Sequence, residues 1–262
     1  MSNSGRLASI RRVWTKIREV ELRFLAAGIA YYAFVSSLPL LGLGIAIVSV
    51  ASGAGSAEWL LAVIGQFLTP ALQRLVREGL QTSGDRTAVT LTGLAVFLWS
   101  GARLVRAVDI AFVRIYEVEG EKTTVDRLRD VVLTLVTIDA GVVATIALGA
   151  FVADSGAHLS GALGAALVVA GVAPLLLPTF YILPGTDVGV AEVVPGSLFT
   201  ASAWTALQVA FQFYVANVAR IALYGVLGTA LVVMTWLYLG ALALLLGATL
   251  NAGLVGQTAA TD

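Results

Sequence analysis

The sequence predicts an all-α, polytopic membrane helix bundle: six transmembrane helices, with an outer amphipathic helical segment between spans one and two. The first observation is composition, because 58% of the 262 residues are hydrophobic, only 12% are charged, and the mean hydropathy is +0.91. A soluble globular chain carries about 25% charged residues. One soluble core cannot hide so much apolar surface, so lipid is the expected solvent.

The second observation is a series of long apolar runs, each near the ~20 residues that a helix needs to cross the hydrocarbon core. The predicted spans are approximately 25–51, 88–108, 128–153, 159–183, 193–218 and 221–250. The first run is longer than the roughly 7–15 apolar residues of a signal peptide, so we expect it to stay uncleaved. The predicted organisation is a basic N-terminal segment at 1–23, a membrane domain at 24–253 and a short tail at 254–262.

The third observation is the distribution of basic residues, because cytoplasmic loops of membrane proteins carry an excess of Lys and Arg. A cytoplasmic N-terminus places the following residues inside: Arg6, Arg11, Arg12, Lys16, Arg18, Arg23, Arg103, Arg106, Arg114, Lys122, Arg127 and Arg129. It leaves outside Arg74, Arg77, Arg86 and Arg220. We therefore expect a multi-pass protein of the cell membrane with both termini cytoplasmic and with membrane lipids as partners.

The segment 57–81, between the first two spans, is too polar at its end to cross the bilayer. Its apolar residues fall on helical faces in two runs, which Thr69 and Pro70 separate. Threonine suits an N-cap and proline the first helical position, so two short amphipathic helices are expected at the outer surface. They are either a lid packed on the bundle or an interfacial element that gates a lipid-facing opening.

The composition argues against an enzyme, a metal protein or a nucleic-acid-binding protein. The chain has 0 Cys and 1 His (His158), so neither a thiolate site nor a multi-histidine zinc centre is available. It has no Gly-rich phosphate loop and no nucleophile elbow, and its formal net charge of +0 gives no bulk attraction to nucleic acid. We expect no catalytic residues, no metal and no cofactor. An intramembrane hydrolase with Ser and a carboxylate on separate helices is the enzymatic alternative.

Asp139 is the most interesting polar residue of the predicted spans. It lies about eleven residues into span three, which is ~16 Å deep in a hydrocarbon core of ~30 Å. An ionised carboxylate there is costly, and desolvation raises a carboxyl pKa. Asp139 is therefore either a protonated group that carries protons through a transport cycle or a neutral acid that hydrogen-bonds a neighbouring helix.

Arg103, Arg106 and Asp109 are at helical spacing where span two meets the cytoplasm. One interpretation is topological anchoring together with a solvated Arg106–Asp109 pair, because arginines near helix ends extend to the interface. The other is a basic vestibule that captures an anionic head group or substrate.

Pro39, preceded by Ser36 and Ser37, is expected to kink the first span. A proline frees a backbone carbonyl, which small polar side chains and neighbouring helices can satisfy. The kink is either purely structural or a hinge for alternating access.

Gly240, Ala243 and Gly247 form a small-residue stripe on one face of the last span, and such stripes mark close helix packing. Aromatic side chains elsewhere in the spans either pack in the bundle, line a pathway or belong to interfacial belts. They are Tyr31, Tyr32, Trp99, Trp204, Trp236 and Tyr238.

Three blocks of the sequence resemble the YihY/BrkB family of integral membrane proteins. The first is AYYAFVSSLPL at 30–40, and the second is LP at 183–184 followed by VPGSL at 194–198 and FQFY at 211–214. The third is YGVLG at 224–228, continuing through WLYL at 236–239 to LGATLNA at 246–252. The blocks follow the family's order and bracket nearly the whole chain.

The resemblance implies a six-span bundle in the cytoplasmic membrane and, in function, a transporter or exporter. The polar residues of the predicted spans add the expectation of a lipid-like or small amphipathic or anionic substrate, with proton linkage as an option. The alternative is a non-transporting structural or interaction protein of the membrane. The ribonuclease label that family members have carried is disfavoured. Where the family often shows Gly-Ala-Glu-Leu-Asn, this chain has Thr249 in place of the acid and keeps Asn251.

Overall fold

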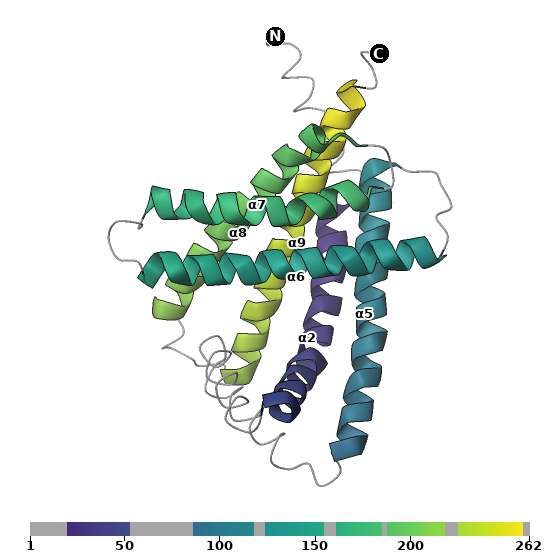
Figure 1. The fold of residues 1–262 in the computed structure, drawn as a ribbon, viewed down its shortest axis with the longest axis vertical. Helices are drawn as coiled ribbons and strands as arrows, with labels where there is room; N and C mark the ends of the chain where they lie inside the picture. Colours follow the sequence, from purple (N-terminus) through teal and green to yellow (C-terminus); the bar gives the residue numbers. More distant parts are fainter. Residues whose placement is uncertain are drawn as a thin grey trace. The chain divides into compact units, whose positions relative to one another are not determined.

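The computed structural model describes residues 20–52, 86–117, 124–154, 161–184, 188–217 and 225–258, and these residues are helical except at short turns (Figure 1). The helices are α2 (Leu22–Ser52), α5 (Arg86–Tyr116), α6 (Thr124–Asp154), α7 (Ala162–Ile182), α8 (Val190–Asn217) and α9 (Gly225–Thr258). The prediction of an all-α chain is confirmed.

Each predicted span overlaps one of these helices. Two helical stretches within the described residues are long and apolar enough to cross a membrane, Ala162–Ile182 in α7 and Ala230–Leu254 in α9. Shorter apolar stretches are Leu22–Ser37 in α2 and Val136–Val152 in α6. The predicted outer segment 57–81, His158 and both chain termini lie outside the described residues.

Local backbone chemistry sets the ends of two helices. At the start of α8 the Gly189 N–H donates to Glu192 Oε2 at 2.9 Å and the Glu192 N–H donates to the Gly189 carbonyl at 2.9 Å. The Glu192 side chain makes the bond that the third helical residue makes in a capping box, and the backbone turn supplies the other, so two amide groups of the first turn are satisfied. At the end of α5, Glu117 has φ 54°, the left-handed conformation that commonly terminates a helix.

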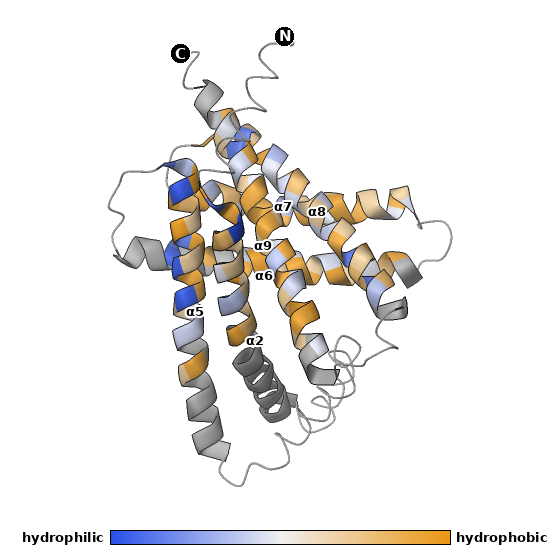
Figure 2. Cartoon of the chain, turned by 180° about the vertical axis from the view of Figure 1, so that it is seen from behind, coloured by the Kyte–Doolittle hydropathy of each residue, from blue (hydrophilic) through white to orange (hydrophobic). Residues whose placement is uncertain are grey.

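The chain forms two compact units. The described residues of unit 1 come from the start of α2, the second half of α5, all of α6 and α7, most of α8 and the second half of α9. Within unit 1, α6 and α7 lie side by side over their length, as Figures 1 and 2 both show. Gly141 of α6 lets this pair approach α8 as well, because a methyl group there would lie 2.9 Å from Leu176 Cδ2 and 3.2 Å from Trp204 Cζ3.

The core of unit 1 is built on apolar stripes at helical spacing. On α5 the fully buried residues are Val108, Ala111, Phe112 and Ile115. They repeat at intervals of three and four residues, the pattern of one packed helical face. The same core takes from α7 and α9 the buried residues Val172, Leu176, Phe180, Leu244, Leu245 and Ala248. The second half of α5 therefore turns an apolar face inward and a charged face outward.

The described residues of unit 2 come from α2 beyond Ile29, the first half of α5 and the first part of α9. Tyr32 of α2 and Trp99 of α5 meet edge to face, with ring centroids 6.4 Å apart. Tyr31 lies against Tyr32 in the same way at 5.3 Å.

Large apolar side chains are exposed along the helices, and Figure 2 shows their hydrophobic colouring. Examples are Val136 at 61%, Val143 at 64%, Leu163 at 58% and Leu231 at 66% exposure. Soluble proteins rarely expose continuous apolar surface on this scale, whereas a helix in lipid satisfies its backbone internally and presents such side chains to the acyl chains. The surface is that of an integral membrane protein.

Candidate functional site

The closest helix crossing within unit 1 joins α8 and α9 at two glycines. A methyl group on Gly247 would lie 2.8 Å from the Gly196 carbonyl oxygen and would also collide with Thr200 Oγ1. A methyl group on Gly196 would collide with the Gly247 carbonyl oxygen. The two backbones therefore touch directly, and no larger residue fits at either position without movement of a helix.

The small-residue stripe predicted on the last span lies along this crossing. The Trp204 Nε1–H of α8 donates to the Gly240 carbonyl at 3.1 Å, and Thr200 Oγ1 donates to the Ala243 carbonyl at 3.4 Å. Because these residues of α9 have small side chains, the side chains of α8 can reach their carbonyl oxygens. Hydrogen bonds of this kind hold membrane helices together where the hydrophobic effect does not.

Asn251 joins the same two helices through its carboxamide. It is fully buried; its Oδ1 accepts a hydrogen bond from the Gly196 N–H at 2.7 Å, and its Nδ2 donates to the Val193 carbonyl at 3.2 Å. Pro195 lies inside α8 between the two residues that Asn251 contacts, and a proline inside a helix removes one N–H donor and disturbs the preceding turn. The geometry of α8 near its start therefore depends on a residue of α9.

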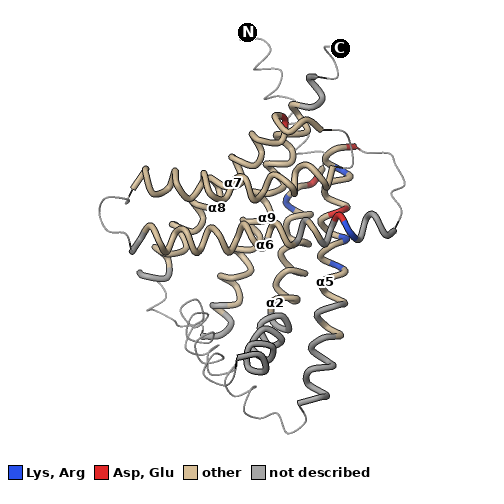
Figure 3. Tube along the Cα trace, in the orientation of Figure 1, with Lys and Arg blue, Asp and Glu red and all other residues tan. Residues whose placement is uncertain are grey.

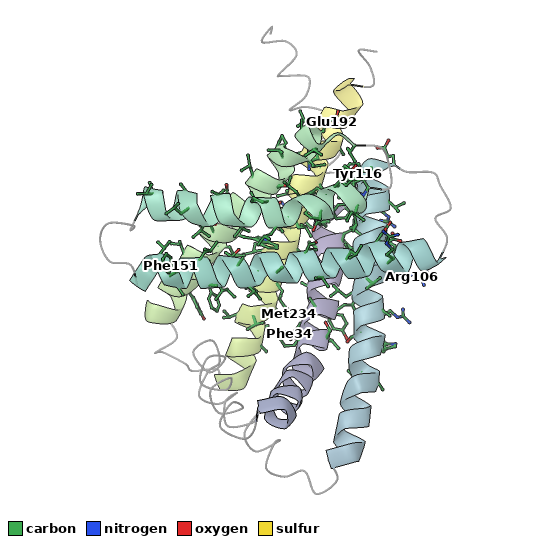
Figure 4. All side chains as sticks on the ribbon, in the orientation of Figure 1. Phe34, Arg106, Tyr116, Phe151, Glu192 and Met234 are labelled. Atoms are coloured by element: carbon green, nitrogen blue, oxygen red, sulfur yellow. The ribbon has the colours of Figure 1, made fainter. Side chains whose placement is uncertain are left out.

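Tyr116 lies at the end of α5 (Figure 4), near the Asn251 side chain. Its ring stacks on Phe112 with centroids 6.1 Å apart, and Phe112 contacts Phe180 of α7 at 6.3 Å. The Tyr116 hydroxyl is a buried side-chain oxygen without a hydrogen-bond partner among the described residues. Burial raises the pKa of this phenol, and the nearby Asn251 side chain opposes the shift without reaching hydrogen-bonding geometry. Tyr116 therefore stays neutral over the physiological pH range.

Thr249 occupies the position where the resemblance leads one to expect an acid. It is fully buried, and its hydroxyl donates to the Leu245 carbonyl of its own helix at 2.8 Å. A carboxylate in this place would lose its hydration without a described cation to replace it. The threonine is thus a neutral, internally satisfied substitute.

The charged candidates of α5 lie on its outward face. Arg103 and Arg106 are exposed and Asp109 is half-buried. Figure 3 colours the basic and acidic residues of α5, and Figure 4 shows the side chain of Arg106. The guanidinium of Arg103 lies over the Trp99 ring, 5.7 Å from its centroid. Both arginines point away from the apolar stripe of the same helix.

Asp139 belongs to the middle of α6, between two positions that face the rest of unit 1. Two residues before it, Thr137 Oγ1 and Thr179 Oγ1 share a hydrogen bond of 2.7 Å, and two residues after it Gly141 packs against Leu176. The side chain of Asp139 lies outside the described part of the structure.

The hinge candidates lie on α2, which is helical from Leu22 to Ser52 and contains Pro39. Ser36 Oγ donates to the Tyr32 carbonyl at 2.8 Å, and Ser37 Oγ donates to the Phe34 carbonyl at 2.7 Å. The serines thus bond to carbonyls of the preceding turn of α2. The ring of Pro39 lies outside the described side chains.

Reasoning from the sequence missed Tyr116 and the partner of Asn251. The sequence does contain a signal for Tyr116. It lies one helical turn after Phe112 and two turns after Val108, so it continues the buried stripe of α5. Asn251 and Gly196 are separated by 55 residues, and nothing in their local sequence pairs them. Within the described residues, no three His, Cys, Asp or Glu side chains gather in a way that could hold a metal ion.

Comparison with known proteins places this chain among membrane proteins. It is 28% identical over 244 residues to YfkH of Bacillus subtilis, whose name likens it to a ribonuclease, with 87% of this chain and 88% of that protein covered. A UPF0761 membrane protein of Alkalilimnicola ehrlichii is 28% identical over 250 residues, covering 90% of this chain and 55% of that relative. The UPF0761 membrane protein PSHAa0171 of Pseudoalteromonas translucida is 24% identical over 241 residues, covering 87% and 79%.

No solved structure matches the chain. The family model for the virulence factor BrkB matches residues 13–262, nearly the whole sequence. Two of the relatives are named as membrane proteins and none of the three by a demonstrated enzymatic activity. The chain is an integral membrane protein that belongs to the virulence factor BrkB family.

Proposed function

We propose that the protein is a transporter of an amphipathic, anionic substrate and that movement of α8 against α9 is part of its cycle. The observation that carries the proposal is the amide joint, in which Asn251 of α9 bonds both the Gly196 N–H and the Val193 carbonyl of α8. Because a side chain of α9 hydrogen-bonds to the backbone of α8, we expect the local geometry of α8 to change when the two helices separate.

Interrupted helices are characteristic of transporters, where irregular backbone at membrane depth is satisfied by other parts of the protein. Besides Pro195 in α8, α7 carries Pro174 and Pro178 inside its length. Both helices are continuous in the structure, and the prolines are points at which they can bend. Their concentration in the two helices that contact α9 favours a moving part over a static scaffold.

The class of substrate follows from the outward face of α5. Arg103 and Arg106 are exposed there, beside exposed apolar residues such as Ile110 at 38%. Guanidinium groups bind carboxylate and phosphate oxygens, while the apolar neighbours accept a hydrocarbon part. The combination suits a molecule with an anionic head and an apolar body.

Proton coupling is assigned to Asp139 as part of the same proposal. The buried polar side chains that the structure describes are hydroxyls and one carboxamide, and most of the hydroxyls bond to a carbonyl of their own helix, as Thr145 does to Gly141 at 2.7 Å. Such groups do not titrate at physiological pH. A carboxyl group in the middle of α6 is therefore the natural proton carrier.

The proposed topology has six spans in the cell membrane with both termini cytoplasmic, which follows from the distribution of basic residues. The alternative function is a non-transporting membrane protein that holds partners. A static α8–α9 contact would serve that role, whereas the bonding of Asn251 to the backbone of α8, together with the prolines inside α7 and α8 and the exposed arginines, favours transport. The ribonuclease-like name of one relative is not carried over, and we propose no enzymatic activity.

The test is a flux measurement with the purified full-length chain in lipid vesicles. Fluorescent phosphatidylglycerol serves as the anionic amphipath, and dithionite bleaches the molecules that reach the outer leaflet. We expect a bleaching rate above that of protein-free vesicles, reduced in Asn251→Leu and retained in the matched variant Thr249→Val, whose hydroxyl bonds only within α9. A rate equal to that of protein-free vesicles for anionic amphipaths of several chain lengths contradicts transport and favours the partner-holding role.

A further inference from the structure

A chain of aromatic rings ending in an arginine lies on the surface of unit 2. Tyr31 and Tyr32 of α2 meet at 72° with ring centroids 5.3 Å apart, and Tyr32 meets Trp99 of α5 at 76° and 6.4 Å. The guanidinium carbon of Arg103 lies 5.7 Å from the centroid of the Trp99 ring. We call these four residues the aromatic–arginine cluster.

The cluster is open to its surroundings. Trp99 is 52% exposed, Tyr31 is 48% exposed and Arg103 is exposed. The described residues give Arg103 the Trp99 ring as its contact and no carboxylate partner. A cation–π contact holds the guanidinium plane while its N–H groups remain free to bind an anion.

The position of Arg103 along α5 places the cluster at the membrane interface. From Arg86, where α5 begins, to Arg103 the helix rises ~26 Å, close to the ~30 Å of the hydrocarbon core. Trp and Tyr concentrate at headgroup level, and an arginine at the end of a span extends toward the same layer. The Arg103 guanidinium is therefore expected to extend to the phosphate layer, and the exposed Trp99 ring to lie about 6 Å below it along α5.

We propose that the aromatic–arginine cluster is a binding site for the headgroup of an anionic phospholipid. The lipid phosphate lies against the free N–H edge of Arg103, and Trp99 and Tyr31 contact the glycerol and the first methylene groups. Two parallel N–H donors match two phosphate oxygens, and this geometry makes arginine a better partner for phosphate than a point charge. The proposal shares Arg103 with the proposed function, but headgroup binding is measured without transport, so either proposal can fail alone.

Anchoring without a specific lipid is the competing explanation, and Arg114 separates the two. Arg114 is exposed on the same helix, eleven residues beyond Arg103 and therefore ~16 Å further along its axis. The headgroup layer on each side is only about 5–8 Å thick, so Arg114 lies past it. A site at the cluster requires Arg103, whereas a general attraction of anionic lipid responds equally to either charge.

The experiment is native mass spectrometry of the purified full chain titrated with phosphatidylglycerol and with phosphatidylcholine. Arg103→Gln is expected to lower the affinity ratio of the two lipids about fivefold, the effect of about one basic residue at an anionic surface. Trp99→Leu is expected to lower it about two- to fivefold, since the guanidinium loses its support. Arg103→Lys is expected to recover part of the ratio, and Arg114→Gln to stay within about twofold of the parent chain. Circular dichroism of each variant checks that the helices are retained.

Three results would overturn the proposal. The first is an unchanged ratio in both Arg103→Gln and Trp99→Leu. The second is a loss in Arg114→Gln as large as that in Arg103→Gln, which means a general charge effect. The third is displacement of phosphatidylglycerol by free glycerol phosphate at equal concentration, which assigns the site to a soluble phosphate and not to a lipid.

Discussion

Replacing Asn251 by leucine tests the amide joint, because leucine keeps the branched shape of asparagine and removes both hydrogen bonds. The Val193 carbonyl retains a partner, since Ser197 Oγ donates to it at 3.0 Å. The Gly196 N–H loses the Asn251 Oδ1 that accepts from it at 2.7 Å. The cost is therefore mainly that of one hydrogen bond to a buried backbone donor, and its upper limit is the roughly 1–3 kcal/mol of a donor left unsatisfied.

Membrane surroundings lower this figure, because hydrogen bonds between membrane helices average ~0.6 kcal/mol and reach ~1.7 kcal/mol. Burial of Asn251 within protein argues for the upper part of that range, so we expect Asn251→Leu to reduce the free energy of unfolding by about 1–2 kcal/mol. The assay is reversible unfolding in mixed micelles with increasing dodecyl sulfate, followed by circular dichroism.

Thr249→Val is the matched control. It also removes a buried polar group from α9, but the Leu245 carbonyl that accepts its hydroxyl belongs to the same helix. A change within about 0.5 kcal/mol is expected for the control. An Asn251→Leu chain that unfolds at the midpoint of the parent, or no earlier than Thr249→Val, would refute the joint as a stabilising contact.

The remaining predictions concern the crossing, the buried phenol and the proton. Gly247→Ala should destabilise the chain by about 1–3 kcal/mol, because the new methyl group overlaps α8. The control is Gly101→Ala, which should be neutral or stabilising because a methyl group there meets nothing within 4 Å. Equal effects of the two substitutions would contradict the crossing. The pKa of Tyr116 is raised in the folded state, so ionisation favours the unfolded chain. The parent should therefore lose stability relative to Tyr116→Phe only above pH about 10, the pKa of tyrosine in the unfolded chain. A difference in stability that does not change with pH would contradict this. Asp139→Asn should insert normally and lose the pH dependence of flux, and full pH-dependent activity would leave Asp139 a structural role.

The helices of this protein could be predicted from the sequence because few backbone conformations are stable in lipid. A backbone in the hydrocarbon core must satisfy its own hydrogen bonds, so every long apolar run had to be a helix. The ends of the helices were predicted less well than their existence. The helix α5 continues to Tyr116, beyond the predicted span end at 108, because its second half is packed on one face and charged on the other. Hydropathy alone detects the lipid-embedded part and not such an extension.

The candidate site was predictable as a set of residues and not as an arrangement. The small-residue stripe indicated a close approach on α9, but only the structure gives Gly196 as the residue opposite Gly247. Asn251 attracted notice because it keeps the asparagine of the family motif, and its partners are backbone groups of α8, which carry no sequence signature. Tertiary hydrogen bonds to the backbone depend on where two helices cross, and that depends on the whole bundle.

The measurement that tests the central claim most directly is a pair of spin labels across the α8–α9 joint. The chain has 0 Cys, so Val190→Cys and Leu254→Cys, both at exposed positions, introduce the only thiols. Pulsed dipolar spectroscopy of the labelled chain in nanodiscs should give two distance populations, one with the joint closed and a longer one with it open. Adding Asn251→Leu should enrich the longer population by about fivefold or more, the effect of losing roughly 1 kcal/mol. A single narrow distance that Asn251→Leu leaves unchanged would contradict the movement of α8 against α9.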